Sequence, residues 1–166
     1  MKRFAILAFA IAVSGCMPEN EKARGVLKGD ENLPKAEVSI EFVDAGPEET
    51  VGAGPYAEKA SEGGVLVVVT YKVTNTGKLP VGPDQIPAIQ IYDPAGTAYS
   101  SDLGRTAAFM TEPNEAQVDA KAWSDLNPGI TTRGAAVFEV SRVAYQAGGW
   151  TVGWVGGQDR WNLPSQ

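Results

Sequence analysis

Short apolar runs, separated by glycine, proline and polar residues, follow one another along most of this chain. Within Ala36–Val43 apolar and polar residues alternate, so that Val38, Ile40 and Phe42 fall on one side of an extended backbone. This alternation with a period of two predicts a half-buried β-strand. The run Val65–Thr74 begins with five consecutive apolar residues, which predicts a central strand covered on both faces.

The remaining apolar runs predict further strands with turn residues between them. These strands are expected at Ile86–Tyr92, Thr97–Tyr99, Thr131–Val140, Trp150–Val155 and Arg160–Leu163. Asp93–Gly96 has the proline and glycine of a type I turn, Asp44–Gly64 is predicted to be a long loop, and a helical turn is expected near Pro113–Gln117. About six to eight short strands at this spacing are typical of a β-sandwich. The chain is therefore predicted to form one all-β domain over residues 36–166.

Three segments carry short motifs in a fixed order. Val69–Gly77 ends in Asn-Thr-Gly, Ile91–Tyr99 contains Asp, Gly and Tyr in that order, and Leu126–Val140 begins with a proline–glycine turn before an apolar strand. Together, over residues 36–146, these motifs resemble a bacterial immunoglobulin-like domain of unknown function, often called telokin-like, which is related to secreted immunoprotective antigens. The resemblance implies an immunoglobulin-like β-sandwich and an extracytoplasmic location, and it implies no catalytic residues.

The N-terminus has the organisation of a bacterial lipoprotein signal peptide. A basic pair precedes the apolar run Phe4–Val13, which is too short to cross a hydrocarbon core that takes about 20 residues. The run has the length of a signal-peptide core, and Val13-Ser14-Gly15-Cys16 resembles a lipobox, in which the cysteine is acylated and becomes the mature N-terminus. Residues 1–15 are therefore predicted to be a signal peptide and Cys16 the lipidation site. An ordinary secretory signal with an incidental cysteine is the alternative.

Residues 16–35 are polar, mixed in charge and without apolar periodicity, a composition that buries too little surface to become ordered. This segment is predicted to be a flexible tether between the membrane and the domain. Two or three acyl chains would anchor it firmly, because each buried methylene contributes about 0.8 kcal/mol. In Gram-negative lipoproteins an aspartate after the cysteine favours retention in the inner membrane. Met17 stands there instead, so the resemblance implies the periplasmic face of the outer membrane.

The charge balance and the single cysteine exclude several classes of partner and chemistry. The formal net charge is −6, and removal of Lys2 and Arg3 leaves 12 basic and 20 acidic residues, a net charge of −8. An acidic domain is a poor partner for nucleic acid and for anionic lipid. Cys16 is the only cysteine, so its acylation leaves no thiol for a disulfide, a metal or catalysis.

Candidate catalytic and metal-binding residues are few. The chain has no histidine, which removes the commonest general base and transition-metal ligand, and it has no Ser-x-x-Lys motif. Asp93 and Asp102, or Asp119 and Asp125, lack the alternating acidic spacing of a calcium loop and are expected to be turn residues. We therefore expect no enzyme activity, no cofactor and no bound metal.

The four tryptophans are the remaining candidates for contact with a partner. Trp150 and Trp154 lie four apart on a predicted strand and share a face with Val152, so they are predicted to lie in the core. Trp161 and Trp123 are predicted to be exposed and are the candidate contact residues. The leading hypothesis is a lipid-anchored, non-enzymatic module of the bacterial cell envelope that binds a protein partner through a sheet face or edge. The alternative is a lipoprotein that binds glycan or peptidoglycan through exposed tryptophan.

Replacing the lipobox cysteine tests the predicted anchor. Cys16→Ala removes the sulfur that carries the acyl group, so we expect uncleaved precursor and no incorporation of radiolabelled palmitate. Gel mobility and palmitate labelling of the expressed protein are the two readouts, and Ser14→Ala, which keeps a small residue before the cleavage site, is the control. Labelling of Cys16→Ala at the level of the unchanged chain would contradict the prediction.

Overall fold

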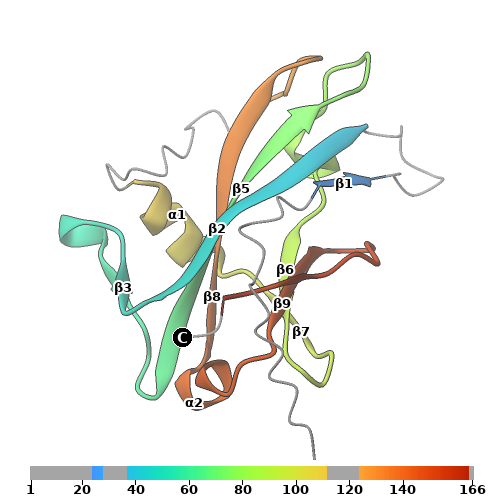
Figure 1. Cartoon of the computed structure of the whole chain (residues 1–166). Helices are drawn as coiled ribbons and strands as arrows, with labels where there is room; N and C mark the ends of the chain where they lie inside the picture. Colours follow the sequence, from blue (N-terminus) through green and yellow to red (C-terminus); the bar gives the residue numbers. More distant parts are fainter. Residues whose placement is uncertain (1–23, 28–36, 112–123, 165–166) are drawn as a thin grey trace, which may run out of the picture.

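Two antiparallel four-stranded sheets pack against each other in the computed structural model, which describes residues 24–27, 37–111 and 124–164 (Figure 1). The first sheet, in the order β1-β2-β5-β8, consists of Arg24–Leu27, Val38–Glu48, Gly64–Asn75 and Thr131–Ser141. The second sheet, in the order β10-β9-β6-β7, consists of Trp161–Asn162, Thr151–Trp154, Ile89–Tyr92 and Ala98–Ser100. The strands β3 (Thr50–Val51) and β4 (Glu58–Lys59) form a small hairpin.

Short helices complete the described part of the chain. They are α1 (Leu103–Met110), α2 (Arg142–Gln146) and the single 3-10 turns η1 (Gly54–Tyr56) and η2 (Pro83–Gln85). None of the helices in the described ranges is long and apolar enough to cross a bilayer.

Apolar side chains from both sheets form the main core. Val38 and Ile40 are fully buried and Phe42 is half-buried against the same cluster, as the alternation within Ala36–Val43 predicted. Ile91 and Trp154 contribute to this cluster from the second sheet. The prediction of an all-β architecture is confirmed by these two antiparallel sheets.

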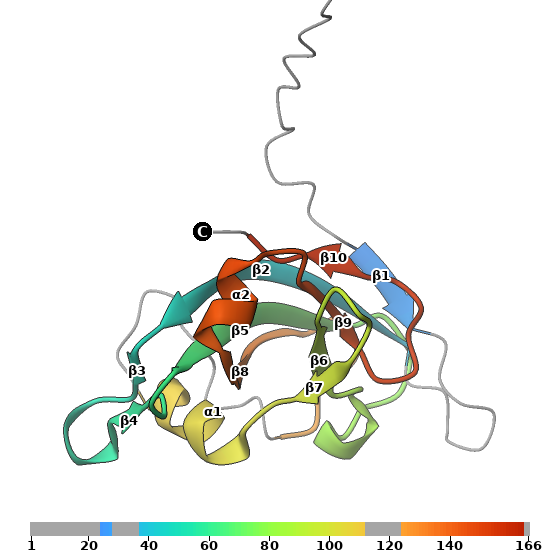
Figure 2. The same ribbon diagram turned by 90° about the horizontal axis from the view of Figure 1, so that it is seen from below.

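The central strand β5 is buried on both of its faces. Val65, Val67 and Val69 belong to the core between the sheets. Leu66 and Val68, which alternate with them, belong to a second apolar cluster with Val51, Ala108 and Val137. Ala108 lies on α1, so this helix covers the outer face of the first sheet beside β5 and β8 (Figures 1 and 2). The prediction of a central strand covered on both sides is confirmed.

The segment Asp44–Gly64 is not the long loop that its composition predicts. Strand β2 continues to Glu48, and β3, η1 and β4 follow it. The pairing of β2 with β5 shifts between Phe42 and Asp44, so Val43 is the extra residue of a β-bulge. Because a bulge reverses the side-chain alternation, Ala45 rather than Asp44 faces the core, and the apolar period that signals a strand is interrupted.

Helix α1 was not predicted from the sequence, which indicated a helical turn only further along the chain, near Pro113–Gln117. Asp102 precedes the helix, and its carboxylate accepts a hydrogen bond from the backbone N–H of Arg105 at 3.0 Å. This N-cap satisfies a donor that the first turn leaves unpaired. Gly104 and Thr106 are weak helix formers, which hides the helix from a propensity argument. The helical turn expected at Pro113–Gln117 lies outside the described residues.

The other predicted elements differ from the structure mainly at their ends. The turn Asp93–Gly96 is confirmed by a hydrogen bond from the Gly96 N–H to the Asp93 carbonyl at 2.9 Å. Within the segment 16–35, predicted to be a tether, Arg24–Leu27 form β1 and pair with β2. The predicted signal peptide and Cys16 lie outside the described residues.

Asn75, at the end of β5, joins three segments of the chain at one end of the sandwich. Its side chain is fully buried, and its amide nitrogen donates to the carbonyl oxygens of Leu79 at 2.8 Å and Leu126 at 2.7 Å. Its amide oxygen accepts from the N–H of Gly77 at 2.9 Å. Both ends of the amide are therefore satisfied, and the segments after β5 and before β8 are held to one side chain.

Truncation of this side chain should be strongly destabilising. Asn75→Ala removes three hydrogen bonds and leaves the Leu79 carbonyl and the Gly77 N–H without this partner, whereas the Leu126 carbonyl keeps the hydrogen bond from the Val81 N–H at 3.0 Å. Each polar group left unsatisfied costs about 1–3 kcal/mol. We expect the free energy of unfolding, measured by urea denaturation, to fall by about 3 kcal/mol or more. Thr74→Ala is the control, because its hydroxyl bonds to that of Thr131 at the solvent-exposed surface. An equal effect of the two substitutions would contradict the assigned role of Asn75.

Candidate functional site

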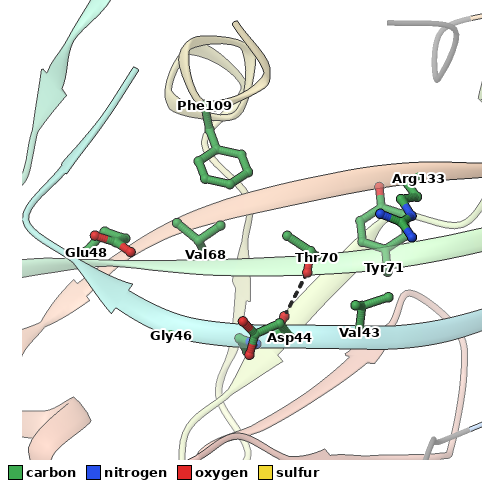
Figure 3. A pocket seen from close by; sticks show the side chains of 10 residues that line it. Val43, Asp44, Gly46, Glu48, Val68, Thr70, Tyr71, Phe109 and Arg133 are labelled. Carbon is green, nitrogen blue, oxygen red and sulfur yellow. Dashed lines mark hydrogen bonds between the residues drawn. The ribbon is translucent and has the colours of Figure 1, made fainter. Parts of the chain in front are cut away.

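An open groove of about 330 Å³ lies on the outer face of the first sheet, between β2 and α1 (Figure 3). Its floor includes Val68 and Thr70 of β5, and Phe109 of α1 points toward Val68 from the helix side. Residues of the bulged half of β2 form one wall, and Arg133 of β8 lies at the other side. Three strands and one helix therefore build the groove from four separate parts of the sequence.

Two features of β2 keep this groove open. Gly46 has no side chain there, and a Cβ at this position would meet no atom within 4 Å. The bulge turns Val43 outward, so that 47% of this residue is exposed although it is apolar. The groove therefore offers an exposed apolar side chain beside empty space, which a larger residue at position 46 would fill.

The groove combines an apolar floor with charged groups at its rim. The carboxylates of Asp44 and Glu48 lie along the β2 wall, and both residues are exposed. The Thr70 hydroxyl donates to the backbone carbonyl of Asp44 at 3.3 Å, which joins the floor to this wall. The β2 side of this surface suits a ligand that brings an apolar group together with a positive charge, whereas Arg133 places a cation on the opposite side. Within the described ranges, no group of three carboxylates or other metal-binding side chains lies close together.

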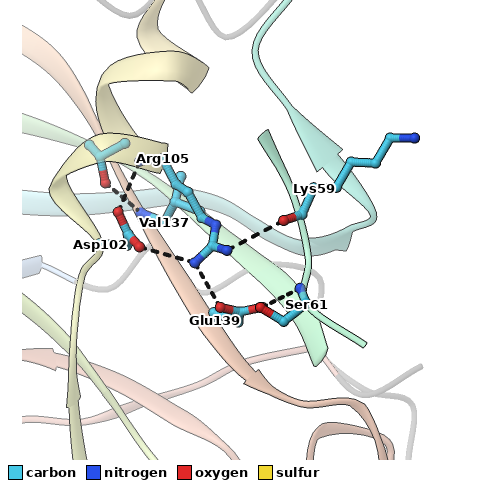
Figure 4. A network of polar contacts seen from close by, with 7 residues as sticks. Lys59, Ser61, Asp102, Arg105, Val137 and Glu139 are labelled. Carbon is cyan, nitrogen blue, oxygen red and sulfur yellow. Dashed lines mark hydrogen bonds and ion pairs between the residues drawn. The ribbon is translucent and has the colours of Figure 1, made fainter. Parts of the chain in front are cut away.

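A network centred on Arg105 joins the start of α1 to β8 (Figure 4). The Arg105 guanidinium donates to the carboxylates of Asp102 at 3.0 Å and Glu139 at 2.7 Å, and to the backbone carbonyl of Lys59 at 3.3 Å. The N–H of Ser61 donates to the second oxygen of Glu139. The network therefore ties α1 to β8 and to the connection between β4 and β5, and it is structural because its charges are already paired.

The two carboxylates of this network have lowered pKa values. The pKa of Asp102 is lowered mainly by the hydrogen bond from the backbone N–H of Arg105, and the positive charge of Arg105 lowers it further. The pKa of Glu139 is lowered mainly by the hydrogen bond from the backbone N–H of Ser61, and Arg105 lowers it further. Both groups therefore stay ionised at neutral pH, which does not suit a general acid or base.

The described tryptophans contribute to the core. Trp150 and Trp154 are buried, as predicted from their spacing. Trp161 is half-buried, with its ring centroid 4.9 Å from that of Phe42 and 5.0 Å from that of Trp154, so the prediction that it is exposed was wrong. Its strand is at the edge of the second sheet in hydrogen bonding, but its side chain packs on the core between the sheets. Trp123 lies outside the described residues.

The groove was not predicted from the sequence. Its residues come from the end of the predicted strand Ala36–Val43, from a segment predicted to be a loop, from a helix that was not predicted, and from the strands predicted at Val65–Thr74 and Thr131–Val140. The only local signal was the polar and small composition of Asp44–Gly46 directly after an alternating strand. That signal is shared by ordinary turns.

These features define a small antiparallel β-sandwich with an open groove on one sheet face. Residues 33–147 match the family described as Domain of unknown function (DUF4352), and the chain belongs to this family. The uncharacterized protein YxkC of Bacillus subtilis (strain 168) is 39% identical over 117 residues, or 70% of this chain. The match spans 62% of the length of YxkC.

Two solved structures share the architecture. A crystal structure of a conserved hypothetical protein from Bacillus anthracis has a TM-score of 0.68 at 19% identity, over 88% of this chain and 99% of that one. A crystal structure of an uncharacterized β-sandwich protein from Clostridium difficile 630 has a TM-score of 0.51 at 16% identity, over 89% of this chain and 99% of that one. At these identities the similarity concerns the fold alone, and it confirms the β-sandwich.

Acid should destabilise the domain through Asp102 and Glu139. Because their folded pKa values are lowered, their contribution to stability is complete above the unfolded values, near pH 4, and is lost as the pH falls through the folded values. We expect the free energy of unfolding to decrease from about pH 5 to about pH 3, as measured by urea denaturation.

The substitution Glu139→Gln should make this pH dependence shallower, while lowering stability at pH 7 because the ion pair with Arg105 is lost. Glu62→Gln, at an exposed position, is the matched control and should leave the pH profile unchanged. A profile for Glu139→Gln that runs parallel to that of the unchanged chain would exclude Glu139 as a source of the acid sensitivity.

Proposed function

We propose that this chain is a non-enzymatic interaction module that is anchored by lipid in the bacterial cell envelope and binds a protein partner. The groove on the outer face of the first sheet is the observation that supports this proposal most directly. We further propose that the sandwich is of the immunoglobulin-like, telokin-like type suggested by its three sequence motifs.

The chemistry of the groove favours one kind of partner segment. Val43 and Phe109 offer apolar contact, while Asp44 and Glu48 place two carboxylates along one wall. The whole chain is also acidic, with a formal net charge of −6, and therefore attracts basic partners over distance. The proposed partner segment presents an apolar side chain next to a lysine or arginine.

The anchor and the location follow from the lipobox. Acylation of Cys16 attaches the chain to a membrane, and Met17 after it favours the periplasmic face of the outer membrane in a Gram-negative cell. The absence of histidine from the sequence supports a non-enzymatic role. Binding of glycan or peptidoglycan by stacking on tryptophan has less support, because Trp150 and Trp154 are buried and Trp161 is half-buried.

Site-directed photo-cross-linking in cells tests this function. A photoreactive amino acid at Val43, on the groove, should give one dominant protein adduct, whereas the same residue at Val143, an exposed apolar position on α2, should not. Mass spectrometry of the isolated envelopes identifies the adduct.

A second substitution shows whether the adduct depends on the groove. Gly46→Leu places a side chain in the groove at a position where a Cβ would meet no atom within 4 Å, so it should abolish the Val43 adduct, and Gly46→Ala should weaken the adduct less. An adduct that is equally strong in Gly46→Leu would exclude the groove as the contact surface. Adducts with peptidoglycan fragments alone would favour the glycan-binding alternative.

A further inference from the structure

A second cavity, of about 200 Å³, opens at the side of the sandwich between strand β8 and helix α1. It shares Tyr71 with the groove on the outer sheet face, and its walls are otherwise formed by different, mainly apolar residues. These walls include Val73, Ile86, Ile89, Leu103, Met110 and Ala136. Leu103 is 72% exposed, which places an apolar side chain in contact with solvent beside the cavity.

One polar group in this apolar lining has no partner. Thr132 lines the cavity and is only 7% exposed, and its hydroxyl makes no hydrogen bond. A buried hydroxyl without a partner is costly, and native proteins keep few of them. Thr132 therefore marks a position where a ligand can supply the missing hydrogen bond.

Tyr71 and Gly134 shape the cavity next to this hydroxyl. They pair across β5 and β8, and the Tyr71 ring lies over the glycine so closely that a Cβ at Gly134 would come within 2.7 Å of it. The glycine thus allows the tyrosine ring to cross the sheet toward the edge of β8. Both residues line the cavity, which brings it to the edge of the strand.

At one residue along this edge, Val137, the backbone groups of β8 that point away from β5 have hydrogen-bond partners. The Val137 N–H donates to the Thr106 hydroxyl at 3.0 Å, and the Val137 carbonyl accepts from the N–H of Asp102 at 2.8 Å. Because backbone groups alternate in direction along a strand, those of Ala135 point the same way. Ala135 lines the cavity, and the part of the chain that the structure describes supplies no comparable cap for it.

We infer that this edge accepts an extended peptide segment of a protein partner, which pairs with β8 at Ala135 and inserts one tyrosine side chain into the cavity. The volume favours a single side chain, because pockets for whole small-molecule ligands are typically about 300–1,000 Å³. Tyrosine combines an apolar ring with a hydroxyl that can bond to Thr132. Addition of a strand to an open sheet edge is a common mode of peptide recognition. The inference specifies a partner chemistry for the proposed function at a second surface.

Three capped pentapeptides that differ only at the centre test this site. A fluorescently labelled peptide with alternating valine and threonine around a central tyrosine is titrated with the full chain carrying Cys16→Ala, and binding is followed by anisotropy. We expect the tyrosine peptide to bind about 5- to 10-fold more tightly than the phenylalanine peptide, since one hydrogen bond is gained. The alanine peptide should bind at least about 10-fold more weakly than the phenylalanine peptide, because the cavity stays unfilled.

The substitution Thr132→Val separates the hydrogen bond from the packing. It keeps the shape of the side chain and removes the hydroxyl, so the preference for tyrosine over phenylalanine should disappear while the phenylalanine peptide still binds. A preference that persists in Thr132→Val would overturn the assignment of the hydroxyl. If Thr132 had only a structural role, Thr132→Val would weaken binding of the tyrosine peptide and of the phenylalanine peptide equally.

Removing a backbone N–H from β8 or from the peptide tests whether the two strands pair. Ala135→Pro removes an N–H that β5 does not use, and it should abolish binding of all three peptides while circular dichroism shows an unchanged fold. N-methylation of the amide next to the central tyrosine blocks the same pairing from the peptide side and does not alter the protein.

Two outcomes would overturn the inference. Unchanged binding of the N-methylated peptide would exclude the edge pairing, and binding of free p-cresol as tight as that of the tyrosine peptide would assign the cavity to a small molecule. Neither outcome affects the cross-link at Val43, which tests the proposed function separately.

Discussion

Burial of β5 on both faces is the constraint on which the rest of this structure depends. The inward side chains of β5 build the core between the sheets, and the outward Leu66 and Val68 require a cover of their own. Helix α1 supplies that cover through Ala108 and Phe109. Because one short helix cannot span the whole sheet face, space is left beside it. The groove occupies that space toward β2, whereas the second cavity opens at the side of the sandwich between β8 and α1.

Polar contacts then fix the elements that the apolar contacts bring together. Arg105 holds the start of α1 to Glu139 of β8, and Asp102 caps the helix and also donates its N–H to the edge of β8. At the other end of the sandwich, the amide of Asn75 performs the same task for the chain segments that flank β5 and β8. The two candidate sites therefore lie on a frame whose geometry is determined by directional hydrogen bonds, which favours a preformed surface over an adaptable one.

Period-two alternation predicted the strands where it was uninterrupted. Val38 and Ile40 in β2, the run at the start of β5, and the pair Trp150 and Trp154 all have the predicted burial. The prediction failed beyond Phe42, because the bulge at Val43 changes the phase of the alternation. It failed again at α1, which is stabilised by a cap at Asp102 and by contact with β5 rather than by its own propensity. The prediction that Trp161 is exposed was wrong because an edge strand can still direct a side chain into the core.

The sequence by itself determined the all-β class, the two-sided burial of β5, the tryptophan core and the exclusion of histidine-dependent chemistry. Each of these follows from local composition or from a period along one segment. Only the tertiary structure decided where the open surfaces lie. The groove unites Val43, Gly46, Phe109 and Arg133, which no local pattern relates. The unpaired hydroxyl of Thr132 likewise becomes visible only when the neighbours that fail to bond it are known, because hydrogen-bond satisfaction is a property of the packed chain.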